Sequence, residues 1–196
     1  MRIVLTGGPS AGKTTVADTL ARAYFDRLIL VPEAASMLYR GGFPREEILP
    51  AVICQQRAIY HVQKELEEIK TITAGQRSQI CDRGTLDGLA YWPTSQEDFF
   101  KHIGSSMDQE VARYAWVIHL DTASELSYQA STIRKETYKE AQEINKRIKD
   151  AWAQHPRRIL IPNNSNFSRK ITLALTAVRL ILEGAQDDDV RSVMLE

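Results

Sequence analysis

The sequence predicts an α/β fold in which five parallel strands form one sheet and helices cover both of its faces. Short apolar runs rich in β-branched residues alternate along the chain with segments whose apolar residues recur at helical spacing, a pattern typical of consecutive strand and helix units. A glycine-rich loop lies between the first strand and the first helix. With 196 residues, 43% of them hydrophobic and 26% charged, the chain has the length and composition of an ordinary globular protein rather than a disordered or fibrous one.

Short apolar runs that end in glycine, proline or aspartate predict the strands. The expected strands are residues 2–6, 28–31, 79–81, 115–120 and 158–161. Right-handed crossover connections between them make the sheet parallel, with helices on both faces. Ligands of such sheets bind at the carboxyl ends of the strands, so the residues that follow each strand are the candidates for a site.

Helical spacing of apolar residues predicts the segments between the strands. The expected helices are residues 13–25, 33–40, 45–70, 86–92, 96–103, 107–114, a charged helix ending near Trp152, and a last helix from Asn166 or Ser168 to Glu183. Pro50 is compatible only with a first turn. We expect residues 1–184 to form a single domain and residues 185–196, with their run of aspartates, to be a flexible acidic tail.

Charge and cysteine usage limit the possible partners and the compartment. Lys+Arg 25 and Asp+Glu 25 leave no net charge, so no global field attracts the protein to nucleic acid or to an anionic membrane. Cys54 and Cys81 lack the spacing of a disulfide scaffold or a zinc site, and the four histidines show no metal-ligand spacing. We expect a cytoplasmic protein without a membrane span; its oligomeric state is left open.

The strongest motif is GGPSAGKT over residues 7–14, which matches G-x-x-x-x-G-K-[ST] between a strand and a helix. In such a loop the backbone N–H groups surround phosphate oxygens, and the free N–H groups at the helix start add positive potential. The loop therefore predicts a nucleotide site; its expected nucleotide-binding residues are Gly7, Gly8, Pro9, Ser10, Ala11, Gly12, Lys13, Thr14 and Thr15. Lys13 is expected to contact the β- and γ-phosphates and Thr14 to ligate Mg²⁺.

An acidic residue at the end of another strand should complete the nucleotide site. Asp82 follows the third expected strand in QICDRG, and we interpret it as the carboxylate on the Mg²⁺ side. Hydrolytic ATPases usually carry a glutamate directly after that aspartate to activate water, whereas this chain has Arg83. The replacement favours phosphoryl transfer over hydrolysis.

The motifs of guanine-specific switch proteins are missing from the sequence. No D-x-x-G segment occurs, and Asn145 and Lys146 are followed by Arg147 and Ile148 within an expected helix instead of completing N-K-x-D. Guanine recognition by that route is therefore excluded.

Several motifs together resemble one family over nearly the whole chain. GGPSAGKTT, VPEAA, GGFPR, CDRGTLDGLAYWP, the segment around Arg134 and HPRRILIP resemble the small P-loop ATPase/kinase family that includes the ribosylnicotinamide-kinase domain of NadR and the Ttd14 proteins, within the AAA-domain ATP-binding proteins. The resemblance implies a three-layer α/β/α P-loop NTPase fold of the nucleotide-kinase type with a helical lid. It also implies ATP or GTP with Mg²⁺, without identifying a substrate.

The resemblance to nucleoside and nucleotide kinases also suggests acceptor-side residues. Glu33 follows the second expected strand, where these kinases carry a carboxylate that accepts the proton of the attacking hydroxyl; a helix-start carboxylate is the alternative interpretation. Arg83 is expected to contact phosphate or acceptor. Asp87 lies four residues further on and either reaches the same pocket or caps a helix. Trp92 is a minor acceptor candidate, because such aromatics more often lie in a core.

Two further residues come from the segments that form lid and base site in these kinases. Arg134 lies between the fourth strand and the charged helix, where a lid cation would close over the transferring phosphoryl group. Asn163 follows the fifth strand, where related kinases hold the nucleotide base, although asparagine-rich turns need no ligand.

The hypothesis from the sequence is a Mg²⁺-ATP-dependent kinase that phosphorylates a small hydroxyl-bearing, nucleoside-like acceptor. GTP in place of ATP stays open. The alternative is an ATP- or GTP-binding regulatory or trafficking protein with slow hydrolysis, in which the bound nucleotide sets a conformation.

Overall fold

The computed structural model describes residues 1–122, 137–163 and 166–193. Within these residues one sheet has the strand order β2-β3-β1-β4-β5, and all of its pairings are parallel. Its strands are β1 (Arg2–Thr6), β2 (Leu28–Val31), β3 (Ser78–Asp82), β4 (Trp116–Leu120) and β5 (Arg158–Ile161). The predicted five-stranded parallel sheet is confirmed.

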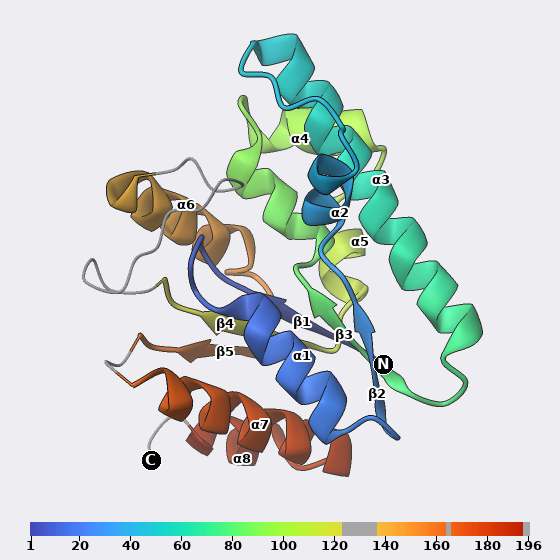
Figure 1. Cartoon of the computed structure of the whole chain (residues 1–196), viewed down its shortest axis with the longest axis vertical. Helices are drawn as coiled ribbons and strands as arrows, with labels where there is room; N and C mark the ends of the chain where they lie inside the picture. Colours follow the sequence, from blue (N-terminus) through green and yellow to red (C-terminus); the bar gives the residue numbers. More distant parts are fainter. Residues whose placement is uncertain (123–136, 164–165, 194–196) are drawn as a thin grey trace.

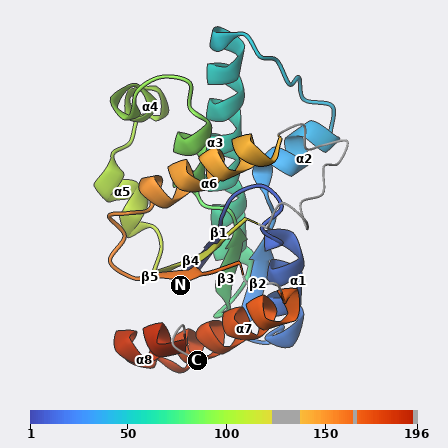
Figure 2. The same cartoon turned by 90° about the vertical axis from the view of Figure 1, so that its left-hand side faces the viewer.

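Helices cover both faces of the sheet (Figures 1 and 2). One face carries α1 (Lys13–Ala23), α7 (Phe167–Glu183) and α8 (Asp187–Ser192). Over the other face and the β2 edge lie α2 (Ala34–Arg40), α3 (Leu49–Thr73), the 3₁₀ helix η1 (Thr85–Tyr91), α4 (Gln96–Ile103), α5 (Met107–Ala112) and α6 (Tyr138–Ala151). The three-layer α/β/α arrangement is therefore also as predicted.

The central strand β1 shows why the sheet is buried on both sides. Ile3 and Leu5 point into the cluster beneath α1 and α7, whereas Val4 points into the cluster beneath η1 and α6. Successive side chains of a strand alternate between faces, so a strand covered on both faces reads as a continuous apolar run. None of the three side chains is exposed to solvent.

Several helices differ from their expected ends by one or two residues, and two differ more, in boundary or in type. The long helix α3 begins at Leu49 rather than residue 45, with Pro50 in its first turn, where the missing N–H costs nothing. Residues 45–48 instead form an extended connection. Residues 85–91 form a 3₁₀ helix; the periodicity of apolar residues did not distinguish this tighter turn from an α-helix.

The acidic tail differs most from expectation, because residues 187–192 form helix α8 rather than a flexible segment. Val190 is fully buried in the cluster beneath the sheet, and Asp187 accepts a hydrogen bond from Arg157 Nε at 2.9 Å. The aspartates of its first turn also complement the positive helix start. Val193 at the end of the helix is also buried, so apolar side chains dock the segment, which its acidic composition did not indicate.

Across the described segments, none of the helices combines the length and hydrophobicity that crossing a bilayer would require.

We predict that Val190→Ala lowers the free energy of unfolding by about 1–3 kcal/mol, the cost of truncating a buried aliphatic side chain. Urea denaturation measures this. Asp188→Ala, at a side chain that is 98% exposed, is the control, with an expected change within about 0.5 kcal/mol. Equal stability of both variants and the wild type would mean that α8 does not dock.

Candidate functional site

The carboxyl ends of three neighbouring strands bring the predicted site residues together. The order β2-β3-β1 places Glu33 after β2, Asp82 and Arg83 at the end of β3, and the loop 7–14 after β1 side by side. Residues far apart in the sequence therefore meet at one edge of the sheet, where α/β proteins bind ligands.

The loop after β1 has the backbone conformation of a phosphate cradle. Gly7 and Gly12 have φ of 138° and 84°, which glycine adopts without strain. A Cβ on Gly7 would lie 2.0 Å from the carbonyl oxygen of Leu120, so no other residue fits. Of the remaining cradle residues, Pro9, Lys13 and Thr14 line a cavity, Ser10 has φ of 58°, Ala11 is buried and Thr15 is exposed.

Lys13 lies buried beside this cavity. Its Nζ donates to the carbonyl oxygen of Gly8 at 2.8 Å. Burial, reinforced by the positive charge of Arg83, lowers the pKa of Lys13 to about 7 despite the opposing effect of three nearby carboxylates. A further negative charge in the cavity would restore the charged form of the lysine.

Thr14 and Asp82 present oxygen ligands suited to Mg²⁺. Thr14 Oγ1 donates to Asp82 Oδ2 at 2.8 Å, while Asp82 Oδ1 is buried without a hydrogen-bond partner among the described residues. Such an orphaned carboxylate oxygen fits a hard cation. The described segments contain no group of three or more His, Cys, Asp or Glu that would hold a metal alone, so phosphate and water oxygens would complete the shell, as is usual for Mg²⁺.

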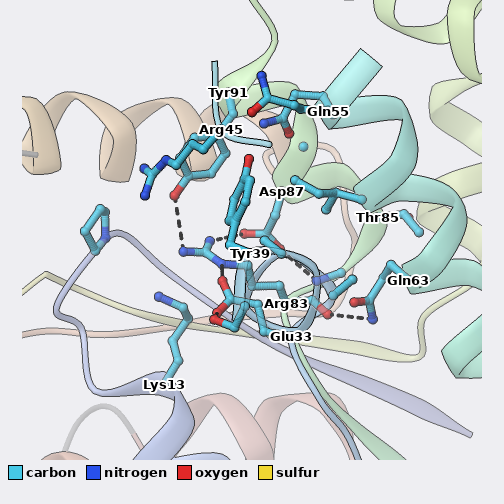
Figure 3. A pocket seen from close by; sticks show the side chains of 18 of the residues that line it. Lys13, Glu33, Tyr39, Arg45, Gln55, Gln63, Arg83, Thr85, Asp87 and Tyr91 are labelled. Carbon is cyan, nitrogen blue, oxygen red and sulfur yellow. Dashed lines mark hydrogen bonds and ion pairs between the residues drawn. The ribbon is translucent and has the colours of Figure 1, made fainter. Parts of the chain in front are cut away.

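Arg83 is held in an unusual conformation over the loop (Figure 3). Its φ of 77° lies in the left-handed region, which is uncommon for a residue with a side chain. Its Nε donates to Glu33 Oε1 at 2.5 Å, Nη1 to Asp87 Oδ1 at 3.3 Å and Nη2 to the Tyr91 hydroxyl at 3.2 Å. Strain of this kind concentrates at functional sites.

Glu33 immediately precedes α2 and is ionised in this arrangement. Burial opposes its ionisation, but Arg83, Lys13 and the hydroxyl of Ser36 together hold the pKa of Glu33 at about 2. A carboxylate with so low a pKa is a weak base and a good hydrogen-bond acceptor. Glu33 therefore stands at a helix start and also faces the cavity, a position compatible with either interpretation.

Asp87 likewise serves both expected roles. Its Oδ2 accepts from the Gly84 N–H at 2.8 Å, which caps η1, and its Oδ1 accepts from the Thr6 hydroxyl and from Arg83. The residue is 2% exposed and lines the same cavity. The same carboxylate therefore caps η1 and binds Arg83 at the edge of the cavity.

A cavity of about 470 Å³ opens between these charged residues and helices α2, α3 and η1. Its volume suits a small molecule. Figure 3 shows Lys13, Glu33 and Arg83 at one end, with Tyr39, Arg45 and Gln55 at the other. Helix α3 also contributes Gln56 and Gln63 to the lining. Both glutamines were missed in the sequence because only their helical position, and no motif, distinguishes them.

Asn145, at first only a residue of an incomplete guanine motif, braces the phosphate cradle from α6. Its Oδ1 accepts from the Gly8 N–H at 3.0 Å and lies 2.9 Å from His119 Nε2, and its Nδ2 donates to Asp121 Oδ1 at 3.0 Å. Because this oxygen only accepts, His119 carries its proton on Nε2. Burial lowers the pKa of His119 to about 4, so the imidazole is neutral at pH 7.

Lys170 of α7 is a second brace that the sequence did not indicate. Its Nζ donates to the carbonyl oxygens of Asp121 at 2.8 Å and Ala11 at 3.4 Å, and to Asn163 Oδ1 at 3.3 Å. The lysine is 3% exposed. Asn163 therefore lies beside the cradle, at the end of β5, with one acceptor already used by the protein.

Among the expected acceptor-side residues, Glu33, Arg83 and Asp87 line the cavity and Trp92 does not. Trp92 packs in a core cluster against Phe99, with ring centroids 5.2 Å apart, and its Nε1 donates to Asp98 at 3.1 Å. Trp92 does not line the cavity, so the expectation that it contacts an acceptor is withdrawn. Arg134 and the expected lid lie outside the described residues.

Comparison with known proteins agrees with this architecture. The model of a family described as "AAA domain" matches residues 2–170. The solved structure of deoxyadenosine kinase from M. mycoides with bound dATP is similar, with a TM-score of 0.63 and 15% sequence identity over 91% of this chain and 100% of that chain. A search of curated proteins finds no match. The structural likeness shows a P-loop fold of the nucleotide-kinase type.

We predict that His119 makes the protein acid-sensitive. Its pKa of about 4 in the folded protein lies below the ordinary 6.5, so between these values the unfolded chain binds more protons and stability falls as pH decreases, by at most about 1.4 kcal/mol per pH unit. Among the charged groups around the imidazole, Asp121 at the end of β4 raises the pKa of His119, whereas Lys149 of α6 and Lys13 of α1 lower it.

His119→Gln keeps a donor toward Asn145 without titrating. Urea denaturation from pH 4 to 7 should therefore give a shallower loss of stability for this variant than for the wild type. Identical slopes would show that His119 is not the titrating group.

Proposed function

The chain belongs to the AAA-domain family, and from this premise we propose that it is a Mg²⁺-ATP-dependent kinase. The enzyme transfers the γ-phosphoryl group to a small, hydroxyl-bearing, nucleoside-like acceptor. The observation that carries the proposal is the cavity of about 470 Å³, in which Lys13 and Thr14, the expected phosphate ligands, share one wall with Glu33 and Arg83. Two ligands that meet at this wall would be placed for transfer from one to the other.

On this proposal the triphosphate lies in the loop 7–14, with Asn163 on the base side. Lys13 neutralises the β- and γ-phosphates, and Thr14 and Asp82 would hold Mg²⁺, which would supply positive charge against the developing negative charge. Arg83 stabilises the transferring group, because a metaphosphate-like transition state spreads charge over three oxygens. Arg134, from the expected lid, is proposed to add a further cation there.

The acceptor enters from the side of α2 and α3. Glu33 accepts the hydrogen bond of the attacking hydroxyl and orients it, and its low pKa favours this role over full proton removal. Asp87 positions Arg83 and borders the acceptor. The amide of Gln56, which lines the cavity, supplies hydrogen-bonding capacity for a polar ring.

The position of Arg83 directly after Asp82 further supports phosphoryl transfer rather than hydrolysis. A glutamate there would orient water for hydrolysis, whereas the guanidinium is bonded to Glu33 and Asp87 and offers no base to a water molecule. The expected compartment, the cytoplasm, and the absence of nucleic-acid partners remain part of the proposal.

We predict that Lys13→Ala abolishes the thermal stabilisation of the protein by Mg²⁺-ATP and by Mg²⁺-GTP. Wild-type protein at about 100 times the dissociation constant should gain roughly 2.7 kcal/mol. Differential scanning fluorimetry measures the shift in Tm, and Lys101→Ala, an exposed lysine of α4, is the control. An unchanged shift in Lys13→Ala would place the nucleotide elsewhere.

We predict that Glu33→Gln slows phosphoryl transfer roughly 10- to 100-fold, the loss expected for one hydrogen bond to a charged group, while nucleotide affinity stays nearly intact. A screen with radiolabelled ATP against nucleosides identifies the acceptor and then measures the rate. Glu97→Gln, the same chemical change at an exposed carboxylate of α4 that does not line the cavity, should retain the wild-type rate.

The outcome of this screen also separates the two functions. Transfer to some nucleoside supports the kinase. Tight ATP or GTP binding without transfer to any acceptor would support the regulatory or trafficking alternative, and a collapse of nucleotide affinity in Glu33→Gln would assign Glu33 to the nucleotide site.

A further inference from the structure

The left-handed backbone of Arg83 needs support from its surroundings. A non-glycine residue at φ of 77° is strained by roughly 1 kcal/mol or more, so an unsupported chain would relax and carry the guanidinium away from the loop. Its own N–H donates to the carbonyl oxygen of Leu5 at 3.0 Å, which fixes the peptide unit that precedes Arg83. The peptide unit that follows Arg83 must be fixed by other contacts.

Asp87, within the same turn, accepts from the Gly84 N–H at 2.8 Å, and two side chains from other elements also hold the main chain on the far side of Arg83. Gln63 of α3 donates through Nε2 to the carbonyl oxygen of Arg83 at 3.3 Å, as drawn in Figure 3. The hydroxyl of Tyr114 accepts from the N–H of Thr85 at 2.9 Å. The two peptide units flanking Gly84 are therefore each tied to a buried side chain from another element.

Both of these side chains are anchored on one carboxylate. Glu67 Oε1 accepts from Gln63 Nε2 at 3.1 Å and from the Tyr114 hydroxyl at 2.7 Å, and its other oxygen pairs with Arg113. Glu67 is completely buried. A buried charged network is expensive, and apolar packing would often be as stable, so its geometry calls for a role beyond stability.

Gly84 keeps the clamped segment compact. A Cβ at this position would lie 2.7 Å from the ring of Trp152 and 2.9 Å from Val4. The segment therefore has no room to shift toward Trp152, whose ring also packs edge-on against Tyr114 with centroids 5.4 Å apart. This packing and the hydrogen bonds from Gln63 and Tyr114 together restrict the conformation that follows Arg83.

We propose that Gln63 and Tyr114, anchored on Glu67, are positioning residues that hold Arg83 over the phosphate cradle for phosphoryl transfer. They act through the backbone of Arg83. This proposal rests on the kinase function proposed above, in which Arg83 stabilises the transferring group.

We call the bonds from Gln63 and Tyr114 to the main chain the clamp. Tyr114→Phe and Gln63→Met each remove one clamp bond, together with the bond of that side chain to Glu67, and nearly keep side-chain volume. Tyr24→Phe is the matched control, because its hydroxyl donates to the carbonyl oxygen of Leu175 at 3.1 Å, far from the site. The ligands are Mg²⁺-ADP and Mg²⁺-ADP with aluminium fluoride, which imitates the transferring phosphoryl group and thus reports on transition-state contacts without an acceptor.

Calorimetry should give wild-type affinity for Mg²⁺-ADP in all three variants. The fluoride complex should bind about 3- to 10-fold more weakly in the two clamp variants, the effect of one lost hydrogen bond, and normally in Tyr24→Phe. In an Arg83→Met background the clamp substitutions should cause no further loss. The proposal is overturned if the clamp substitutions weaken binding of the fluoride complex equally in the Arg83→Met background. It is also overturned if they do not weaken this binding in the otherwise wild-type protein.

Nitrogen NMR of the Arg83 Nε–H group tests positioning without any ligand. Wild type and Tyr24→Phe should show a slowly exchanging signal from the bond to Glu33, assigned by its absence in Arg83→Lys. The signal should shift or broaden in Tyr114→Phe and Gln63→Met; an unchanged signal in both overturns the proposal. Failure of the wild type to bind Mg²⁺-ADP would instead contradict the kinase function. The NMR signal would still show whether Gln63 and Tyr114 position Arg83.

Discussion

A buried charge must be compensated where it lies, and this constraint governs the carboxyl edge of the sheet. Lys13, Glu33, Asp82, Arg83 and Asp87 meet there because three parallel strands end side by side. The guanidinium binds two of the carboxylates directly. Lys13 loses much of its charge at neutral pH through burial, and Asp82 keeps one oxygen without a partner. The edge is therefore stable without a ligand but electrostatically incomplete, which suits binding of phosphate together with a cation.

The precision of this edge comes from polar side chains behind it. Asn145 holds the N–H of Gly8, Lys170 links the ends of β4 and β5 to the cradle, and Gln63 holds the carbonyl oxygen of Arg83. These side chains come from α6, α7 and α3, on both faces of the sheet. Since each buried polar group requires a partner, the helices are fixed relative to the strand ends by the same bonds that shape the site.

Prediction from sequence succeeded where a local signal sufficed. The strands were found because apolar runs ending in glycine or aspartate are distinctive, and the cradle because its spacing is rare. It failed for α8, where the buried Val190 and Val193 outweigh an acidic composition. For Trp92 the core position, which was the favoured interpretation, is the one found, and it depends on Phe99 of α4. Gln63 and Asn145 could not be found at all, because a polar residue within a helix gives no indication of which buried backbone group it will meet.

The amino-acid sequence by itself determined the fold class, the order of strands and helices along the chain, and the residues of the phosphate cradle, because each depends on neighbouring residues and on periodicity. Only the tertiary structure decided that Glu33 is paired with Arg83, that Asp87 both caps a helix and borders the cavity, and that Gln63 and Tyr114 grip the same segment of chain. Those relations depend on the lateral order of the strands, and that order is set by long-range packing across the sheet.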